Sequence, residues 1–360
     1  MKRFLLSLTV LFTALTAAAG PNSPGAVYTA TNAKTGNEIL VFDRAADGSL
    51  TFSNTISTGG LGSGDSLGNA SAIALSQDHS FLFVVNAGSN DISSFAVGPT
   101  GLTLASRVPS GGQRPISLTT FGSLLFVLNA GGQAGTTDNI AGFSIAGDGT
   151  LTPIAGSTRP LSGSDVGPAQ IAFNGDGTIL AVTEKNTSWI DTYVVNQFGV
   201  AHGPKVFASA GATPFGFAFG KRNQIVVSEA PGSAASSYSI SFSGDLHLIS
   251  ASVADTQAAA CWIAVTNDGR YAYAANAGSS SISGYAIAPD GTLTLLDSDG
   301  QSGLTAKHPV DEAISANGRY LYVLDDQANA ISIFEIRADG SLQKQADAAV
   351  NASTNGLAVR

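Results

Sequence analysis

The stretch Cys261-Trp262-Ile263-Ala264-Val265, followed by the turn Asp268-Gly269 and the apolar run from Tyr271 to Ala275, decides the fold. An Asp-Gly pair between two short apolar runs is a hairpin signal and predicts a type I′ turn. The pattern continues through a third run, Ile282 to Ile287, and a second turn at Asp290-Gly291 that leads into Leu293 to Leu296. This segment therefore predicts four antiparallel β-strands joined by short connections.

The same unit recurs along the whole chain. A turn followed by a short strand occurs seven times, with its strands 46 to 52 residues apart, at Gly48, Gly101, Gly149, Gly199, Gly244, Gly291 and Gly340. Second strands such as Phe81 to Val85 are apolar at consecutive positions, so both faces of each sheet are expected to be covered. Two separate β-sandwiches would not repeat with one period. The sequence predicts an all-β, seven-bladed β-propeller of four-stranded antiparallel blades.

The two ends of the repeat region are complementary. The first unit, which begins near Val27, lacks an innermost strand, and a spare strand, Gly356-Leu357-Ala358-Val359, follows the last unit. We expect the C-terminal strand to pair into the first blade, which would close the ring and remove an open sheet edge.

The N-terminus has the pattern of a secretory signal peptide. Lys2 and Arg3 precede an apolar run from Phe4 to Leu15, and Ala17-Ala18-Ala19 fits a cleavage site. The run is too short for a membrane span. We therefore expect a signal peptide at residues 1–19, a single propeller domain at residues 20–360, and a monomeric periplasmic or secreted protein.

Charge and cysteine content exclude several classes of function. The formal net charge is −9, which makes nucleic acid a poor partner, and only 12% of residues are charged. Cys261 is the only cysteine, so no intrachain disulfide is possible. We expect no resident cofactor. Ca²⁺ held by carboxylate and amide oxygens is an alternative that no Asp-rich loop supports, and no metal ligands are assigned.

Superposition of the repeats predicts where chemistry would occur. In a four-stranded meander, the start of the innermost strand and the end of the second strand lie together at one mouth of the central channel. The residues expected at second-strand ends are Asn32, Asn86, Asn129, Glu184, Glu229, Asn276 and Asp325. Those expected at or near first-strand starts include Arg114, Gln170, Phe215, Trp262, His308 and Asp311, with Lys185 close by. The expected mouth is polar and acidic.

Each of these residues also has a purely structural interpretation. Asn is a good strand-terminating and turn residue, so most amides of the ring are expected to be structural, whereas Glu184 and Glu229 break the pattern in neighbouring blades. Trp262 and Phe215 fit either a stacking platform or a channel plug. The segment from Gly64 to Gly68 fits G-x-S-x-G, but without a strand before it and a helix after it we interpret it as a connecting loop.

Several stretches resemble one protein family. The second-strand sequences Asp268-Gly269-Arg270-Tyr271-Ala272-Tyr273 and Asn317-Gly318-Arg319-Tyr320-Leu321-Tyr322-Val323 look like those of the seven-bladed propeller lactonases, which include 6-phosphogluconolactonases and carboxymuconate lactonizing enzymes. Residues 182–186, 213–217, 228–230 and 259–262 are similar to an exported bacterial branch. The resemblance implies lactone hydrolysis, or the reverse cyclisation, at the channel mouth.

The chain departs from the family at most of its catalytic positions. The resemblance implies histidines after Pro168, an Arg-His pair after Pro214 and an arginine at Ala277, and of the expected set only Glu229 matches. We therefore expect Glu229 or Glu184 as general base, Arg114 or Lys185 near the oxyanion, and His308 at the mouth. Expected ligand contacts, for a lactone or sugar-like molecule, are Asn129, Lys185, Phe215, Trp262, Asn276, Asp311 and Asp325. The alternative is a non-catalytic propeller that binds a small ligand, a sugar or a protein partner.

Overall fold

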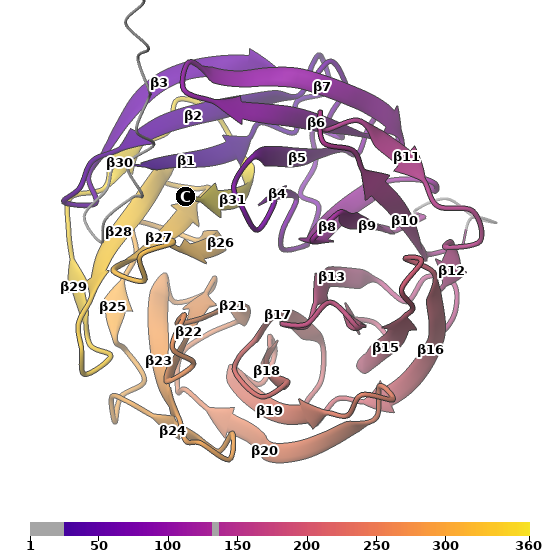
Figure 1. Ribbon diagram of the computed structural model, residues 1–360. Helices are drawn as coiled ribbons and strands as arrows, with labels where there is room; N and C mark the ends of the chain where they lie inside the picture. The colour runs from indigo at the N-terminus through magenta and orange to yellow at the C-terminus, as the bar shows by residue number, and fades with distance from the viewer. Residues whose placement is uncertain (1–24, 132–136) are drawn as a thin grey trace, which may run out of the picture.

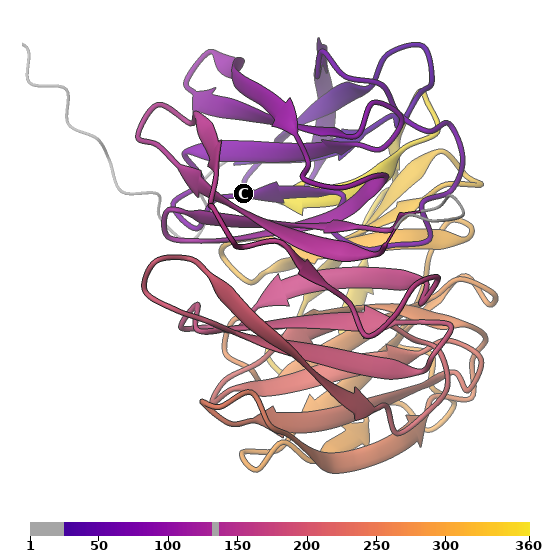
Figure 2. The same ribbon diagram turned by 90° about the vertical axis from the view of Figure 1, so that its right-hand side faces the viewer.

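A computed structural model describes residues 25–131 and 137–360, which form seven antiparallel sheets arranged as blades around a central channel (Figure 1). Figure 2 shows the same blades after a turn of 90° about the vertical axis. The expected signal peptide lies outside the described residues. Within the described part of the chain, no helix is long and apolar enough to cross a membrane.

Each blade runs from an outer strand to an innermost strand beside the channel. Blade 1 contains, in that order, β3 (Leu50–Ser57), β2 (Glu38–Arg44), β1 (Gly25–Ala30) and β31 (Asn355–Val359). Blade 2 contains β7 (Gly101–Pro109), β6 (Asp91–Gly98), β5 (Phe81–Asn86) and β4 (Ile73–Leu75). Blade 3 contains β11 (Leu151–Pro153), β10 (Asn139–Ile145), β9 (Leu124–Asn129) and β8 (Pro115–Phe121), with β12 (Arg159–Pro160) also paired to β10.

The remaining four blades follow the same order. Blade 4 contains β16 (Ala201–Ala208), β15 (Trp189–Val195), β14 (Ile179–Glu184) and β13 (Pro168–Phe173). Blade 5 contains β20 (Leu246–Ala254), β19 (Ala234–Ile240), β18 (Gln224–Glu229) and β17 (Pro214–Phe219). Blade 6 contains β24 (Leu293–Leu295), β23 (Ser281–Ile287), β22 (Tyr271–Asn276) and β21 (Ala260–Val265), with β25 (Gly303–Leu304) on β23. Blade 7 contains β29 (Leu342–Lys344), β28 (Ala330–Ile336), β27 (Tyr320–Asp325) and β26 (Pro309–Ile314), with β30 (Ala348–Ala349) on β28.

The C-terminal strand closes the ring, as the repeat pattern predicts. β31 pairs antiparallel with β1, with Val359 opposite Val27 and Ala358 opposite Tyr28, and Figure 1 shows the yellow strand beside the indigo one. Two backbone hydrogen bonds between Ala26 and Arg360 extend the pairing beyond the strand end. Blade 1 is thereby completed by residues from both ends of the described chain, and all seven blades have four strands in the ring order.

Polar side chains join the innermost strands of neighbouring blades. These strands do not pair with one another, so their channel-side N–H and C=O groups need other partners. The Gln170 amide receives a hydrogen bond from the Phe217 N–H at 2.8 Å and donates one to the Phe217 carbonyl at 2.9 Å. Asp311 accepts from the Leu357 N–H at 3.1 Å. The ligand contact expected of Asp311 is therefore replaced by a bond between blades 7 and 1.

The core and the turns agree with the sequence pattern except in one detail. Second strands are buried on both faces, and Leu125 to Leu128 have no exposed surface. The Asp-Gly turns, however, are not type I′, because only the glycine takes a positive φ, as at Gly48 (φ 86°). The Gly48 N–H bonds to the Ala45 carbonyl, and the Asp47 carboxylate accepts from the N–H of Ser49. The aspartate is favoured as an acceptor within the turn.

Candidate functional site

One mouth of the channel is built by the strand ends that the repeats indicate. The final residues of six second strands are Asn86, Asn129, Glu184, Glu229, Asn276 and Asp325. In the register, Glu184 lies opposite Pro168 and Glu229 lies opposite Pro214, so inner-strand starts and second-strand ends do meet. The exception is blade 1, where β1 ends at Ala30 and Asn32 lies two residues beyond it.

The ring of polar strand-end residues lies inside the blades and is not exposed at the mouth. Glu184 is 0% exposed and Glu229 is 1% exposed, and the same near-complete burial holds for Asn129, Asn276 and Asp325. Some of their polar atoms bond to their own blade or to the connection that precedes it, whereas Asn129 Oδ1, Asn276 Oδ1 and Asp325 Oδ2 have no hydrogen-bond partner among the described residues. Asn129 donates to the Ser110 carbonyl and to Asn139, Asn276 donates to Ser281 and Ser283, and Asp325 accepts from the Lys307 N–H.

Glu184 belongs to a buried carboxyl pair in blade 4. It accepts from the Ser162 hydroxyl at 2.6 Å and from the Thr187 hydroxyl at 2.7 Å. The Ser162 N–H lies 3.1 Å from Glu184 Oε1 and 3.0 Å from Asp191 Oδ2, so one amide is shared between the two carboxyl groups. Burial, followed by the charge of Glu184, raises the pKa of Asp191. The hydroxyl groups of Ser162 and Thr187 both donate to this carboxylate, which is a structural reason for the departure of Glu184 from the repeat.

Glu229 has an equivalent structural environment in blade 5. Its carboxylate accepts hydrogen bonds from the Ser236 hydroxyl and, at 2.6 Å, from the Ser252 hydroxyl. A Cβ atom added at Gly211 would clash with the carboxylate oxygens of Glu229, so the connecting segment packs directly on this group. Both glutamates are therefore covered by connecting segments and held by hydroxyl groups.

Arg114, Lys185 and Trp262, which the sequence places near the channel mouth, all bind a segment of the chain that crosses the mouth. This segment, residues 64–70, connects blades 1 and 2 and is called the strap. Lys185 Nζ donates to the Gly68 carbonyl, Arg114 Nη2 donates to the Ser66 carbonyl at 3.3 Å, and Trp262 Nε1 donates to the Asn69 carbonyl at 2.9 Å. These contacts come from blades 3, 4 and 6. The loop interpretation of the G-x-S-x-G match is confirmed, and the loop spans the channel mouth.

Aromatic rings form a surface beside the strap. Phe215 and Trp262 meet edge to face with ring centroids 5.2 Å apart, and the Lys185 ammonium lies 5.1 Å from the centroid of Phe215. Burial, and secondarily the charge of Arg114, lower the pKa of Lys185 to about 8. Trp262 is 6% exposed and Phe215 is 9% exposed, so each side chain presents little surface to the mouth.

A cavity of about 690 Å³, which we call the His308 cavity, opens at this mouth. It runs from blade 1, across the strap, to blades 5, 6 and 7. Of the residues expected to be catalytic or ligand-binding, it is lined by His308, Phe215 and Trp262. Glu184, Glu229, Arg114, Lys185, Asn129, Asn276, Asp311 and Asp325 are not among its lining residues. The four expected catalytic residues therefore do not converge on one open pocket.

His308 and Asp326 form the ionisable pair of this cavity. His308 Nδ1 lies 2.8 Å from Asp326 Oδ1, and both side chains are about one-third exposed, at 37% and 34%. A carboxylate can only accept, so Nδ1 carries the proton and Nε2 of the neutral imidazole is left as the acceptor. This is the arrangement that orients a histidine as a general base.

The repeats explain the positions of both residues of the pair. His308 is the left-handed residue just before an inner strand, a position also held by Ser71, Arg114, Gly167, Thr213 and Ala259. Its positive φ of 54° is therefore a property of the fold and not a mark of function. Asp326 directly follows a second strand, where other blades have Ala87, Ala130, Lys185, Ala230 and Ala277. A comparison of the blades at the position one residue beyond the polar strand ends, where most blades have alanine, would have identified Asp326.

Cys261 also lines the His308 cavity, but its buried environment favours the protonated thiol. Burial raises the pKa of its thiol to about 12, with a smaller opposing effect of Lys185. The reactive form of cysteine is the thiolate, which this raised pKa disfavours at neutral pH.

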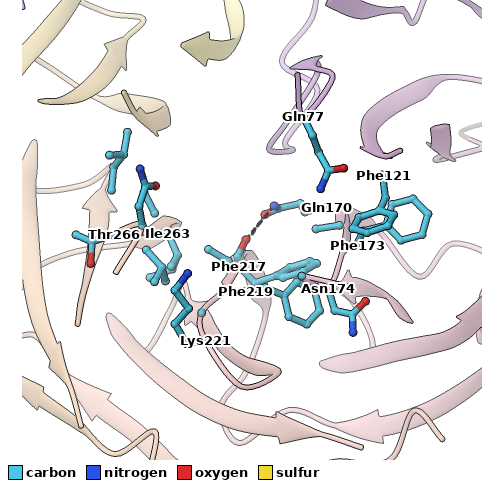
Figure 3. Close-up of a pocket in the computed structure, with 18 of the residues that line it drawn as sticks. Gln77, Phe121, Gln170, Phe173, Asn174, Phe217, Phe219, Lys221, Ile263 and Thr266 are labelled. Atoms are coloured by element: carbon cyan, nitrogen blue, oxygen red, sulfur yellow. Dashed lines mark hydrogen bonds between the residues drawn. The ribbon is translucent and has the colours of Figure 1, made fainter. Parts of the chain in front are cut away.

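A second cavity, of about 540 Å³, lies at the opposite end of the inner strands (Figure 3). Gln170 projects into its centre, and Phe121 and Phe173 lie along one side. The Gln170 amide is occupied by Phe217, and the Asn174 amide oxygen accepts from the N–H groups of Thr178 and Ile179. The described residues that line this cavity include no histidine, whereas the first cavity holds an oriented one, so the His308 cavity is the stronger candidate site.

The alternative of a bound Ca²⁺ ion would need several ligand side chains close together. Across residues 25–131 and 137–360, no three His, Cys, Asp or Glu side chains come together in a group that could hold a metal ion.

Comparison with known proteins gives one family match. The family model described as "Lactonase, 7-bladed beta-propeller" matches residues 26–153 and 223–356. The unmatched stretch between the two matched segments, residues 154–222, includes Pro168-Ala169-Gln170 and Pro214-Phe215-Gly216, where the histidine and arginine residues implied by the resemblance are missing. A search of curated proteins finds no match.

Solved structures share the fold at low sequence identity. A provisionally assigned 6-phosphogluconolactonase from Bacteroides fragilis is 23% identical, with a TM-score of 0.74 over 95% of this chain and 99% of its own. A similarly assigned protein from Bacteroides uniformis is 22% identical, with a TM-score of 0.76 over 93% and 98%. The periplasmic gluconolactonase of Pseudomonas aeruginosa is 18% identical, with a TM-score of 0.74 over 93% and 98%.

Proposed function

Because the chain belongs to the seven-bladed β-propeller lactonase family, we propose that it hydrolyses a lactone in the His308 cavity. The observation that carries the proposal is the 2.8 Å contact between His308 Nδ1 and Asp326 in a cavity of about 690 Å³. Sugar lactones are the proposed substrate class, since relatives of the same fold are named for 6-phosphogluconolactone and gluconolactone.

His308 is the proposed general base. Its Nε2 takes a proton from a water molecule as the water oxygen forms a bond to the lactone carbonyl carbon. The ring C–O bond then breaks, and the proton passes from the imidazolium to the leaving alkoxide, which gives a hydroxy acid. Asp326 keeps the imidazole in the required tautomer and stabilises the transient imidazolium, so it acts as a positioning residue.

Neutral donors are proposed to stabilise the oxyanion in place of Arg114 and Lys185. The lining of the same cavity includes Ser353, Thr354 and Asn355, whose hydroxyl and amide groups can donate hydrogen bonds. Donors directed at the developing negative charge are typically worth several kcal/mol in acyl transfer. The edges of Phe215 and Trp262 supply an apolar wall for the substrate ring.

The second candidate function is ligand binding without turnover. It is favoured because the side chains expected to be catalytic already have partners within the protein. Glu184 and Glu229 are buried and hydrogen-bonded, while Arg114 and Lys185 bind the strap. Under this alternative the same cavity binds a small sugar-like molecule, and the His308–Asp326 pair contributes hydrogen bonds only.

An assay of purified mature protein separates these functions. Acid release from sugar and aromatic lactones is followed at constant pH, with the spontaneous rate subtracted, for the wild type, His308→Gln and His247→Gln. His247 is an exposed histidine of β20 and serves as the matched control. We expect turnover in the wild type and the control and a loss of about 10² to 10⁴ in kcat/KM for His308→Gln. Saturable binding without any turnover would establish the alternative.

Export is part of the proposal. The signal-like pattern at residues 1–19 supports a protein that acts in a periplasm or outside the cell. Fractionation of cells that express the full chain, with Edman sequencing of the recovered protein, tests this, and retention of Met1 in a cytosolic product would contradict it.

A further inference from the structure

We propose that the His308 cavity selects lactones without a phosphate or other anionic group; this inference rests on the proposed lactonase function. The lining of the cavity includes the carboxyl groups of Glu38, Asp65 and Asp326, and its only basic side chain among the described residues is His308. Phosphate recognition in proteins relies on Arg or Lys donors. A phosphorylated substrate would therefore enter a site that is lined by three acidic residues and by one basic residue, His308.

Arg114 and Lys185 bind the strap and are not part of the cavity lining. Ser66 and Gly68 line the cavity, and their carbonyl oxygens accept the hydrogen bonds of Arg114 and Lys185. Neither cation is itself part of the lining. Lys34 lies 3.5 Å from Asp65, but both side chains are largely exposed, at 66% and 73%, so solvent screening leaves this pair weak.

The strap is held on several sides and does not release these cations readily. The Asn32 amide donates to the Asp65 carbonyl at 2.8 Å, and Trp262 binds the Asn69 carbonyl at 2.9 Å. Leu67 is 5% exposed and packs in the hydrophobic core, and the Ala70 N–H bonds to the Ala169 carbonyl at 3.2 Å. Movement of the strap would break these contacts together, so the acidic lining is a stable property of the site.

The charge of the cavity has a second consequence, for the product. Hydrolysis converts a neutral lactone into a carboxylate, which the same three carboxyl groups repel. Neutral substrate therefore binds better than anionic product, and product inhibition is weak. An anionic substituent such as a phosphate would experience this repulsion from the start.

The test compares glucono-1,5-lactone with its 6-phosphate. We expect kcat/KM to favour the neutral lactone by at least about tenfold at low ionic strength, and the preference to shrink in about 0.5 M salt, since screening weakens charge repulsion. Equal values, or a preference for the phosphate, would overturn the inference while leaving the lactonase function intact. If neither compound turns over, the proposed function fails, and calorimetric titration with the corresponding lactam and its 6-phosphate decides the inference by the same ratio.

Variants connect the selectivity to named residues. Glu38 and Asp65 are exposed, so the double substitution Glu38→Gln/Asp65→Asn is expected to fold. It should raise kcat/KM for the phosphorylated lactone about three- to tenfold more than kcat/KM for the neutral lactone, because it removes two of the three repelling carboxylates. Asp43→Asn, at the other end of β2 from Glu38, is the matched control and should change neither value. Unchanged discrimination in the double variant would contradict the assignment.

Discussion

Glu312 is predicted to destabilise the protein, so that Glu312→Ile should make it more stable. In the strand registers, Glu312 lies opposite Val323, and the equivalent inner-strand positions of the other six blades hold apolar residues: Ile73, Leu118, Ile171, Phe217, Ile263 and Ala358. Glu312 is 8% exposed, and neither of its carboxyl oxygens has a well-formed hydrogen bond to any of the described residues. Glu312 also lines the cavity of about 540 Å³, but its carboxyl group replaces the apolar side chain that the other blades have at this position.

The size of the effect follows from the burial of this group. An unsatisfied buried polar group costs about 1 to 3 kcal/mol, and replacing buried ionic groups by packed apolar ones can gain about 1 to 4 kcal/mol. Burial is the main cause that raises the pKa of Glu312 well above 4.5, followed by the charge of Asp311, and the N–H groups of Ala264 and Ala275 oppose it less strongly. The folded state thus holds this proton over a pH range in which the unfolded state releases it.

The sign of the pH dependence follows from this difference. Because the folded-state pKa is raised, the contribution of Glu312 is most favourable below about pH 4.5 and is lost as the pH rises towards the folded-state value, by up to about 1.4 kcal/mol per pH unit. Glu312→Ile removes this loss. The gain in unfolding free energy should therefore be larger at pH 8 than at pH 5, and lie within the range of about 1 to 4 kcal/mol for replacement of a buried ionic group.

Urea denaturation of the wild type, Glu312→Ile and Glu312→Gln at pH 5 and pH 8 measures this effect. Glu312→Gln keeps the shape but cannot titrate, so it should share the altered pH dependence with a smaller absolute gain. A Glu312→Ile variant that is less stable than the wild type at pH 8, or a gain that is equal at both pH values, would refute the reasoning.

The remaining predictions concern the blade contacts and the site. Gln170→Leu leaves the Phe217 N–H and carbonyl without partners and should lower the unfolding free energy by about 2 to 3 kcal/mol in urea denaturation. A loss below about 0.5 kcal/mol, which is typical of a surface substitution, would contradict the hydrogen-bonded bridge between blades 4 and 5. Glu229→Gln should cost about 1 to 3 kcal/mol of stability but keep kcat/KM within about twofold, and a large kinetic loss in a folded variant would return Glu229 to the catalytic set. Trp262→Phe should raise KM about three- to tenfold with little change in kcat, whereas an unchanged KM would remove the indole from the substrate wall.

The architecture was predictable because it depends on local, repeated signals. Turn glycines, consecutive apolar positions in the second strands and the spare C-terminal strand each recur or complement one another, and blade closure follows from them. The Asp-Gly turns were predicted at the right positions but with the wrong type. An Asp-Gly pair is compatible with two turn geometries, and here Asp47 is used as a hydrogen-bond acceptor within the turn.

The exposure of the site residues was not predictable in the same way. The register shows that Glu184 ends a strand, but its burial depends on Ser162 and Thr187 in connections whose paths carry no periodic signal. The strap is a still longer-range feature, since Lys185 and Gly68 are 117 residues apart in the sequence. Asp326 was missed because it lies one position beyond the ring of polar strand ends. Of the expected catalytic residues, His308 is the one that lines the cavity.

The most direct test of the proposed chemistry is the change in kcat/KM for hydrolysis of glucono-1,5-lactone in a double-mutant cycle of His308→Gln and Asp326→Asn. Residues that act as one unit are strongly non-additive, so we expect each single variant to lose activity and the double variant to be no worse than His308→Gln alone. Wild-type turnover in folded His308→Gln, or fully additive losses, would contradict a lactonase whose general base is His308 oriented by Asp326.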